Sequence, residues 1–195
     1  MLREQLKHRN LILASGSPRR QKFFSLLELD FKIDVRPVEE IYPPHLKEAQ
    51  ITNHLAALKA SVFTDLTEKD LLITSDTIVW QDGAAIGKPK NEKDAFQMLS
   101  KLSGTHHEVY TSVCFTGTNF QKTVSDKTKV WFKTLTEQEI RFYISNFQPF
   151  DKAGSYGIQD WLGYIGVEKI EGCFFNVMGL PTRLVYKTLT QLVAE

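Results

Sequence analysis

The stretch from Leu11 to Arg20, LILASGSPRR, decides the fold of this chain of 195 residues. Leu11 to Ala14 form a short apolar run that is typical of a buried strand. Small residues then interrupt the run, and Pro18 follows where a helix can begin, because the missing N–H of proline costs nothing in the first helical turn. Ser17 directly precedes it and is well placed to cap the helix. We therefore predict a strand, a small-residue turn and a helix.

Hydroxyl and guanidinium groups gather at this junction. Ser15 and Ser17 supply two hydroxyls, and Arg19 and Arg20 supply two guanidiniums. The first amides of a helix lack partners within the helix and lie at the positive end of its dipole, so they attract anions. Arginine adds bidentate hydrogen bonds to phosphate. The junction therefore predicts a phosphate site, although an ordinary strand–turn–helix junction with a serine cap is the alternative.

Length and composition indicate a single globular domain. The chain is 42% hydrophobic and 24% charged, which are ordinary values for a soluble protein, and 195 residues suit one sizeable core. The net charge of +1 argues against a nucleic-acid polymer as the main partner, because such partners usually require a strong basic excess. It does not argue against a nucleotide.

The cysteines and the hydropathy pattern predict a cytoplasmic protein. Cys114 and Cys173 each lie in an apolar, strand-like run, which favours free thiols in a reducing compartment over a disulfide or a metal site. The charged first ten residues do not resemble a signal peptide. No apolar run approaches the roughly 20 residues that a membrane span needs, so we expect no membrane partner.

A carboxylate lies in the middle of the apolar run from Leu71 to Trp80, which otherwise has the pattern of a central strand. A buried Asp76 would need hydrogen-bond donors, a cation or a metal ion, whereas a structural aspartate at a strand kink is the alternative. Lys59 lies beside the apolar stripe of a helix predicted over residues 47–65. Its long side chain can reach a cleft or remain in solvent, and both interpretations are open.

The rest of the chain alternates between helical and strand-like patterns. The predicted elements are a half-exposed strand at 31–35, a helix capped by Asn91, a hairpin of Val109–Phe115 with Thr123–Phe132, a helix after the capping box at Thr136–Glu139, strands at Val167–Ile170 and Cys173–Val177, and a helix from Pro181 to about Val193. Lys88 projects from a loop stiffened by Pro89, and Asp151–Gln159 form a loop of small and polar residues. Adjacent His106 and His107 would point to opposite faces of a strand, so we do not assign them a metal.

Taken together, the motifs follow one another in an order that resembles the Maf family of nucleoside triphosphate pyrophosphatases. They are LILASGSPRR (11–20), the turn at Glu40, LAALKA (55–60), SDTIV (75–79), GKP (87–89), LSGTH (102–106), DKAGSYGIQ (151–159) and VMGLP (177–181). The resemblance covers nearly the whole chain. It implies one Maf-like domain over residues 1–195, with a mixed, elongated and twisted α/β sheet, flanking helices, and a cleft between two lobes, related to the inosine triphosphate pyrophosphatases.

The resemblance also implies an activity and a set of site residues. The implied reaction is hydrolysis of a nucleoside triphosphate to the monophosphate and pyrophosphate with a divalent cation, and because the family is often dimeric, a homodimer is an open expectation. The implied roles are phosphate binding by Ser15, Ser17 and Arg20, an acidic residue at Glu40, two cleft lysines at Lys59 and Lys88, and a proton acceptor at Asp76. Glu40 and Asp76 offer hard oxygen ligands that suit Mg²⁺ or Mn²⁺.

Substrate preference depends on three positions. Arg20, Thr77 and Gln159 match the branch of the family that prefers dTTP and UTP. The carboxamide of Gln159 can pair with the N3–H of uracil or thymine, and because an amide can rotate, CTP should be rejected less strongly than purines. The chain departs from the common family pattern at Ser75, where alanine is usual, and at Asp160 and Trp161, where glycine is usual; the second departure changes the rim of the presumed base pocket.

Two other functions remain as alternatives. A regulator of cell division that binds a nucleotide without hydrolysing it would need the phosphate site but not the carboxylates of Glu40 and Asp76, so their presence favours an enzyme. A pyrophosphatase for non-standard purine triphosphates is the other alternative, and Thr77 and Gln159 disfavour it.

Overall fold

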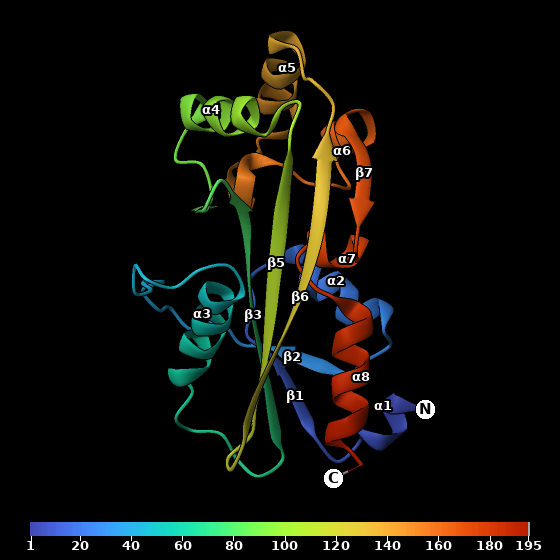
Figure 1. The fold of residues 1–195 in the computed structure, drawn as a ribbon. Coiled ribbons are helices and arrows are strands. Elements are labelled where there is room, and N and C mark those ends of the chain that lie inside the picture. The colour runs from blue at the N-terminus through green and yellow to red at the C-terminus, as the bar shows by residue number, and fades with distance from the viewer. Residues whose placement is uncertain (195) are drawn as a thin grey trace. The chain divides into compact units, whose positions relative to one another are not determined.

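The computed structural model of the protein describes residues 1–194, and these form a mixed α/β fold (Figure 1). The strands pair in the order β2-β1-β3-β5-β6-β7, and β4 pairs with β3. They are β1 (Asn10–Leu13), β2 (Phe31–Ile33), β3 (Asp70–Gln81), β4 (Ala84–Ile86), β5 (His106–Thr116), β6 (Gln121–Phe132) and β7 (Val167–Glu171). The predicted class, a mixed sheet with flanking helices, is confirmed.

Helices connect most of these strands. They are α1 (Leu2–Gln5), α2 (Pro18–Leu26), α3 (Ala49–Ser61), α4 (Glu92–Leu102), α5 (Glu137–Phe147), α6 (Trp161–Gly166), α7 (Phe174–Val177) and α8 (Thr182–Leu192), with short 3₁₀ helices at Pro149–Asp151 and Ala153–Ser155. Within residues 1–194, no helix has both the length and the apolar character needed to cross a bilayer.

The chain forms two compact units, which we describe separately. Unit 1 comprises Met1–Asp76, Thr111–Asp126 and Gly179–Glu195, and unit 2 comprises Thr77–Tyr110 and Lys127–Met178. The first boundary falls within β3, between Asp76 and Thr77, and the next two fall within β5 and β6. This division does not test the expectation of one domain over residues 1–195, which stays a prediction.

In unit 1, the opening stretch folds as its sequence predicts. Leu11 of β1 pairs in parallel with Phe31 of β2 and with Leu71 of β3. Ser17 is the N-cap of α2 and Pro18 its first residue. The helix buries Phe23 and Phe24, each of which contributes roughly 1.5–3 kcal/mol by leaving water.

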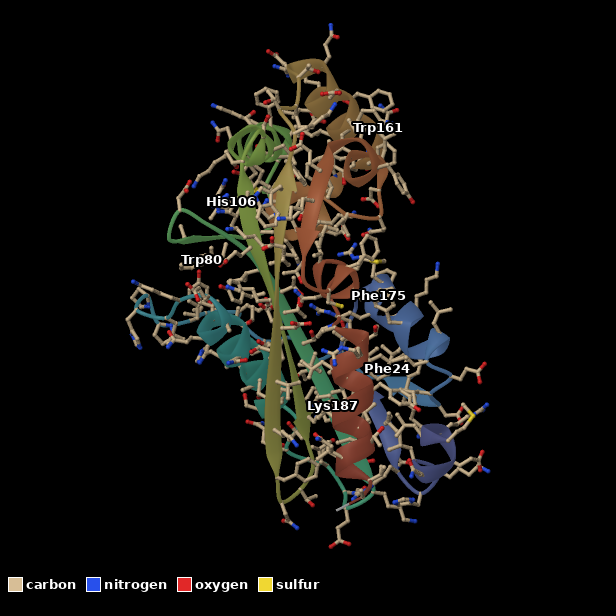
Figure 2. The ribbon with its side chains drawn as sticks, turned by 45° about the vertical axis from the view of Figure 1, so that its right-hand side comes forward. Phe24, Trp80, His106, Trp161, Phe175 and Lys187 are labelled. Atoms are coloured by element: carbon tan, nitrogen blue, oxygen red, sulfur yellow. The ribbon has the colours of Figure 1, made fainter. Side chains whose placement is uncertain are left out.

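Helix α3 packs against the strands of unit 1 through small residues. Ala56 and Ala60 form a buried cluster with Phe63, with Leu72 of β3 and with Cys114 of β5. Figures 1 and 2 place α3 on one side of these strands and α8 on the other. The close approach that alanine allows fixes the position of the C-terminal turn of α3, and that turn carries Lys59.

Unit 2 has its own core, in which α4 and α5 lie side by side (Figure 1). Asn91 accepts a hydrogen bond from the amide of Asp94, and Thr136 and Glu139 form the predicted capping box of α5. The fully buried side chains of this core include Leu99, Leu102, Tyr143 and Leu162.

One predicted strand is wrong. Instead of a strand at 173–177, the structure has the short helix α7 (Phe174–Val177) with Cys173 as its N-cap. The Cys173 amide donates to Thr128 Oγ1, and buried Asn176 donates to Val109 O and to Thr128 Oγ1. These tertiary hydrogen bonds outweigh the β propensity of the segment. Both cysteines are free thiols, with Cys114 buried and Cys173 half-buried.

The two adjacent histidines lie on opposite faces of β5, as predicted. His106 is exposed, whereas His107 is fully buried with Nε2 2.6 Å from the Tyr156 hydroxyl. The ring of His107 also contacts Phe132 and Tyr156 edge-on. Burial, with a smaller effect from His106, lowers the pKa of His107 from 6.5 to about 3.

We expect His107 to make stability depend on pH. Between pH 6.5 and about 3 the unfolded chain binds a proton that the folded chain refuses, so this contribution is complete above pH 6.5 and is lost as the pH falls. The slope is at most about 1.4 kcal/mol per pH unit. Urea titrations at several pH values should show a shallower slope for His107→Gln than for the wild type. The matched variant His106→Gln should keep most of the slope; equal slopes for wild type and His107→Gln would contradict the prediction.

Candidate functional site

A lysine held by two carboxylates forms the centre of the candidate site in unit 1. Lys59 Nζ lies 2.7 Å from Asp76 Oδ1 and 3.2 Å from Glu40 Oε1. The side chains of Asp76 and Lys59 are only 9% and 18% exposed, whereas that of Glu40 is 49% exposed. The two interpretations of Lys59 are thereby resolved, because its ammonium group reaches the buried carboxylate and does not remain in solvent.

Arg20 joins this cluster to the strand–turn–helix junction. Its guanidinium donates to the backbone oxygens of Ser75 and Gly179, at 2.9 and 2.8 Å. Burial lowers the pKa of Arg20 from its ordinary value, and the nearby charges of Asp76 and Glu40 oppose that shift. Arg20 therefore lies close to both carboxylates. Two of its guanidinium nitrogens, Nε and Nη1, donate to backbone oxygens.

Two hydrogen bonds within the strand–turn–helix junction stabilise the turn at Ser15–Ser17. The buried Ser15 accepts a hydrogen bond through Oγ from the Ser17 amide at 3.3 Å, and Gln21 on α2 donates to the carbonyl oxygen of Ser15. Ser17 caps α2 through its backbone position, and its hydroxyl makes no capping hydrogen bond. The hydroxyl of Ser75, the departure noted above, is buried and lacks a hydrogen-bond partner among the described residues.

The three remaining predicted residues lie in unit 2. Thr77 is on β3, the exposed Lys88 follows β4, and Gln159 precedes α6. The Gly154 amide donates to the Gly87 carbonyl at 3.0 Å, so the loop that carries Lys88 is tied to the loop that ends at Gln159. The structure thus brings Ser15, Ser17, Arg20, Glu40, Lys59 and Asp76 together in unit 1, and Thr77, Lys88 and Gln159 belong to unit 2.

Sequence reasoning missed a polar network around Gln159. Asp160 accepts hydrogen bonds from the Gln159 amide and from the Tyr143 hydroxyl, each at 3.0 Å. Lys152 Nζ lies 3.6 Å from the same carboxylate. The departure of Asp160 from the family pattern was the only sequence signal for this network, and Tyr143, some 17 positions away, gave none.

Two carboxylates of unit 1 could hold a divalent cation such as magnesium or manganese. Among residues 1–194 no three His, Cys, Asp or Glu side chains form a group that could hold a metal by themselves. Glu40 and Asp76 nevertheless attract one cationic group, the ammonium of Lys59. Mg²⁺ commonly takes one or two carboxylates and completes its shell with phosphate oxygens and water. Glu40 and Asp76 are therefore the residues that could hold such an ion.

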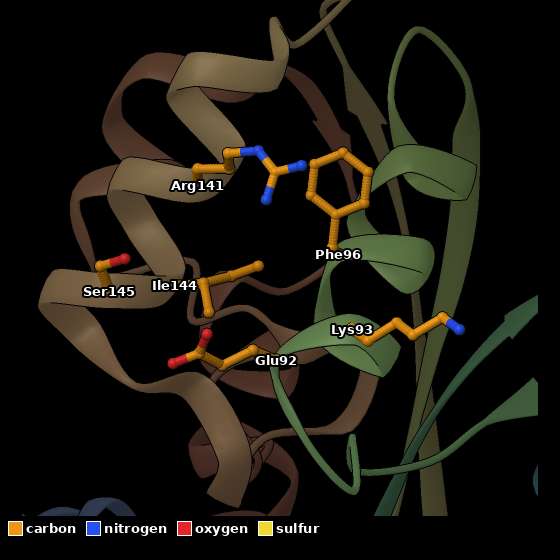
Figure 3. A pocket seen from close by; sticks show the side chains of 6 residues that line it. All are labelled: Glu92, Lys93, Phe96, Arg141, Ile144 and Ser145. Carbon is orange, nitrogen blue, oxygen red and sulfur yellow. The ribbon is translucent and has the colours of Figure 1, made fainter.

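A separate pocket of about 360 Å³ lies between α4 and α5 in unit 2 (Figure 3). Its lining residues are Glu92, Lys93 and Phe96 from α4, and Arg141, Ile144 and Ser145 from α5. The Arg141 guanidinium lies over the Phe96 ring, 4.7 Å from its centre. None of the predicted site residues lines this pocket.

The fold and the site define a mixed α/β protein whose strand–turn–helix junction lies beside a buried lysine–carboxylate cluster. The model of the Maf-like proteins matches residues 10–192, so the chain belongs to the Maf family. Two similar relatives, from Christiangramia forsetii and Flavobacterium johnsoniae, are both called dTTP/UTP pyrophosphatase. They are 58% and 57% identical to this chain over 194 residues, which is 99% of the chain and 99–100% of each relative.

A relative from Phocaeicola vulgatus, of the same name, is 48% identical over 191 residues, covering 97% of this chain and 99% of its own length. Among solved structures, a HAM1 protein from Coxiella burnetii superimposes with a TM-score of 0.52 over 94% of this chain and 99% of its own length, at 12% identity. That likeness concerns the fold alone.

We expect Arg20 to stabilise the fold of unit 1 independently of any ligand. Arg20→Lys replaces a planar fork with a single ammonium group, which leaves a buried carbonyl of Ser75 or Gly179 without a donor. The free energy of unfolding should fall by about 1–3 kcal/mol, measured by urea titration without ligand. Arg183→Lys, on the exposed face of α8, is the matched control and should change it by no more than about 0.5 kcal/mol. Equal effects of the two variants would contradict the structural role.

Proposed function

We propose that this chain is a nucleoside triphosphate pyrophosphatase that hydrolyses dTTP and UTP to the monophosphate and pyrophosphate. The observation that carries the proposal is the buried Asp76 carboxylate held 2.7 Å from the Lys59 ammonium, with Glu40 on the same lysine. Relatives that share 46–58% of their residues with this chain over nearly their full length bear the name of that activity, which supports the proposal.

Cationic side chains and the junction at Ser15–Ser17 would bind the triphosphate. Cleavage at the α-phosphorus increases negative charge on the phosphoryl oxygens and on the leaving pyrophosphate, so catalysis depends mainly on positioning and on nearby positive charge. Arg20 and Lys59 of unit 1 would supply that charge, and Ser15 and Ser17 would orient the phosphates; a third cation at Lys88, in unit 2, stays a prediction. Lys59 contacts two carboxylates, and Glu40 is the more distant and more exposed of them, so a phosphate oxygen can replace Glu40 as its second partner.

Asp76 would accept the proton of the attacking water. Its Oδ1 accepts from Lys59, which leaves Oδ2 as the oxygen that can take the proton. Lys59 also fixes the orientation of the carboxylate, which a general base requires. A divalent cation held by Glu40 and Asp76 would supply Lewis acidity toward the phosphate oxygens and lower the pKa of a bound water.

Thr77 and Gln159 would select the base in unit 2. A carboxamide offers both a donor and an acceptor, which matches the edge of uracil or thymine. We also place the protein in the cytoplasm, because both its cysteines are free thiols, as is usual in a reducing compartment. The proposed substrate is a free nucleotide. A homodimer stays a prediction.

Purified protein with Mg²⁺ or Mn²⁺ should release pyrophosphate from dTTP and UTP, and a chelator should stop the reaction. The products separate the functions: diphosphate with orthophosphate would place cleavage at another phosphorus and refute the mechanism. Binding of a triphosphate without turnover would favour the non-hydrolysing regulator of cell division. A clear preference for inosine or another non-standard purine triphosphate would favour the purine enzyme.

Asp76→Asn should lower kcat by about 10²–10⁴-fold, the usual contribution of a general base, while the protein remains folded. Asp65→Asn is the matched control, because Asp65 also forms an ion pair, but with Arg36 at 2.6 Å and not with Lys59. It should leave kcat within about twofold, since it changes only an exposed ion pair. Pyrophosphate release and circular dichroism should be measured for both. A variant of Asp76 that loses activity only because it unfolds would support the purely structural interpretation.

A further inference from the structure

The carboxylate of Asp160 orders the polar groups at the end of the 151–159 loop. Asp160 Oδ1 accepts from Gln159 Nε2 at 3.0 Å, and Asp160 Oδ2 accepts from the Tyr143 hydroxyl at 3.0 Å. Lys152 Nζ lies 3.6 Å from Oδ2 and 2.7 Å from Asp151. Asp160 and Lys152 are both largely buried, with side-chain exposures of 19% and 13%.

The direction of each hydrogen bond in this network is fixed. The Gly157 amide can only donate, and it donates to the Tyr143 oxygen at 3.0 Å. Burial raises the pKa of Tyr143, so its hydroxyl keeps the proton and donates it to Asp160. A carboxylate only accepts, so the side-chain amide of Gln159 must turn its nitrogen toward Asp160.

The orientation of Gln159 leaves its oxygen without a partner. Gln159 Oε1 is buried and accepts no hydrogen bond from the described residues. An unpaired buried acceptor is costly, and rotating the amide would be worse, because Oε1 would then face the Asp160 carboxylate. The site therefore presents an acceptor that a ligand with an N–H group can satisfy.

The backbone around the network leaves little room for rearrangement. A Cβ atom added to Gly157 would lie 2.5 Å from Asp160 Oδ2 and 2.7 Å from Gln159 Nε2. A Cβ atom on Gly163 would lie 1.9 Å from the Ile158 carbonyl oxygen, so α6 packs directly on the loop. Trp161, the first residue of α6, lies against Phe142 with ring centres 4.8 Å apart. Close packing therefore fixes the positions of Asp160 and of the backbone around Gln159.

We propose that Asp160 is a positioning residue that locks the carboxamide of Gln159 with its oxygen toward the ligand, so that the site accepts uracil or thymine and excludes cytosine. Uracil and thymine carry a donor at N3, which satisfies Oε1. Cytosine has an acceptor at N3, which would face Oε1 acceptor to acceptor. The inference rests on the proposed function, and it replaces the expectation that a rotating amide would let CTP be rejected only weakly.

The test compares UTP with CTP. Asp160→Asn keeps the shape of the side chain but can donate or accept, so Gln159 can rotate to suit either base. The ratio of kcat/KM for UTP to that for CTP should fall about tenfold, the equivalent of one hydrogen bond. The increase in kcat/KM for CTP should appear as a lower KM for CTP with kcat little changed. A general loosening of the fold would not produce that result. Asp160→Glu restores a group that only accepts, and it should recover part of the ratio.

Two control variants separate the proposed orienting effect of Asp160 on Gln159, which we call the lock, from a general effect on the structure. Asp151→Asn makes the same substitution in the other carboxylate that contacts Lys152, and it should leave the ratio unchanged. Tyr143→Phe removes a partner of Asp160 but keeps the bond to Gln159, so it should lower stability and preserve the ratio. If Asp160→Asn does not fold, Asp160→Ser, whose hydroxyl also donates or accepts, takes its place.

Binding of UMP and CMP, measured by calorimetry, separates this inference from the proposed function. A wild type that hydrolyses no triphosphate but binds UMP at least tenfold more tightly than CMP would refute the function and support the lock. A folded Asp160→Asn variant with the wild-type ratio would overturn the lock, whatever the activity. So would a wild type that binds UMP and CMP equally.

Discussion

A carboxylate in the middle of a buried strand is the constraint on which the rest of unit 1 depends. Asp76 would be strongly destabilising there without a partner, and Lys59 provides one at 2.7 Å. That ion pair requires the last turn of α3 to lie against β3, which the alanines of α3 allow. Glu40 and Arg20 then adjoin the same charges, so the need to pair one buried carboxylate organises the loop at Glu40, α3 and the start of α2.

In unit 2, the important constraint is the direction of the hydrogen bonds around Asp160. Tyr143, Asp160 and the Gly157 amide form a hydrogen-bond network in which each donor has one acceptor. This network fixes which end of the Gln159 side-chain amide turns toward Asp160 and which end turns away. In the function that we propose, charge would decide affinity for a triphosphate in the first unit, and the order of donors and acceptors would decide base selectivity in the second. The two units thus rely on different physical interactions: ion pairs around Asp76 and directed hydrogen bonds around Asp160.

Much of the fold and most of the candidate site could be predicted because the relevant signals are local. The apolar run, the small residues and Pro18 define β1, the turn and α2, and the capping box at Thr136 and Glu139 defines the start of α5. Prediction was wrong at residues 173–177, where hydrogen bonds donated to Thr128 and Val109, about 45 and 67 positions away, stabilise a short helix. No local pattern contains that information.

The sequence by itself determined which chemical groups are available: a turn of serines next to arginines, a carboxylate inside an apolar strand, and a lysine beside a helical stripe. Only the tertiary structure decided what those groups do, because their partners come from distant positions. Lys59 has the same local pattern whether it faces solvent or Asp76, and burial of that carboxylate selects the second. Gln159 has two amide orientations in isolation, and Asp160, itself bonded to Tyr143, stabilises one of them.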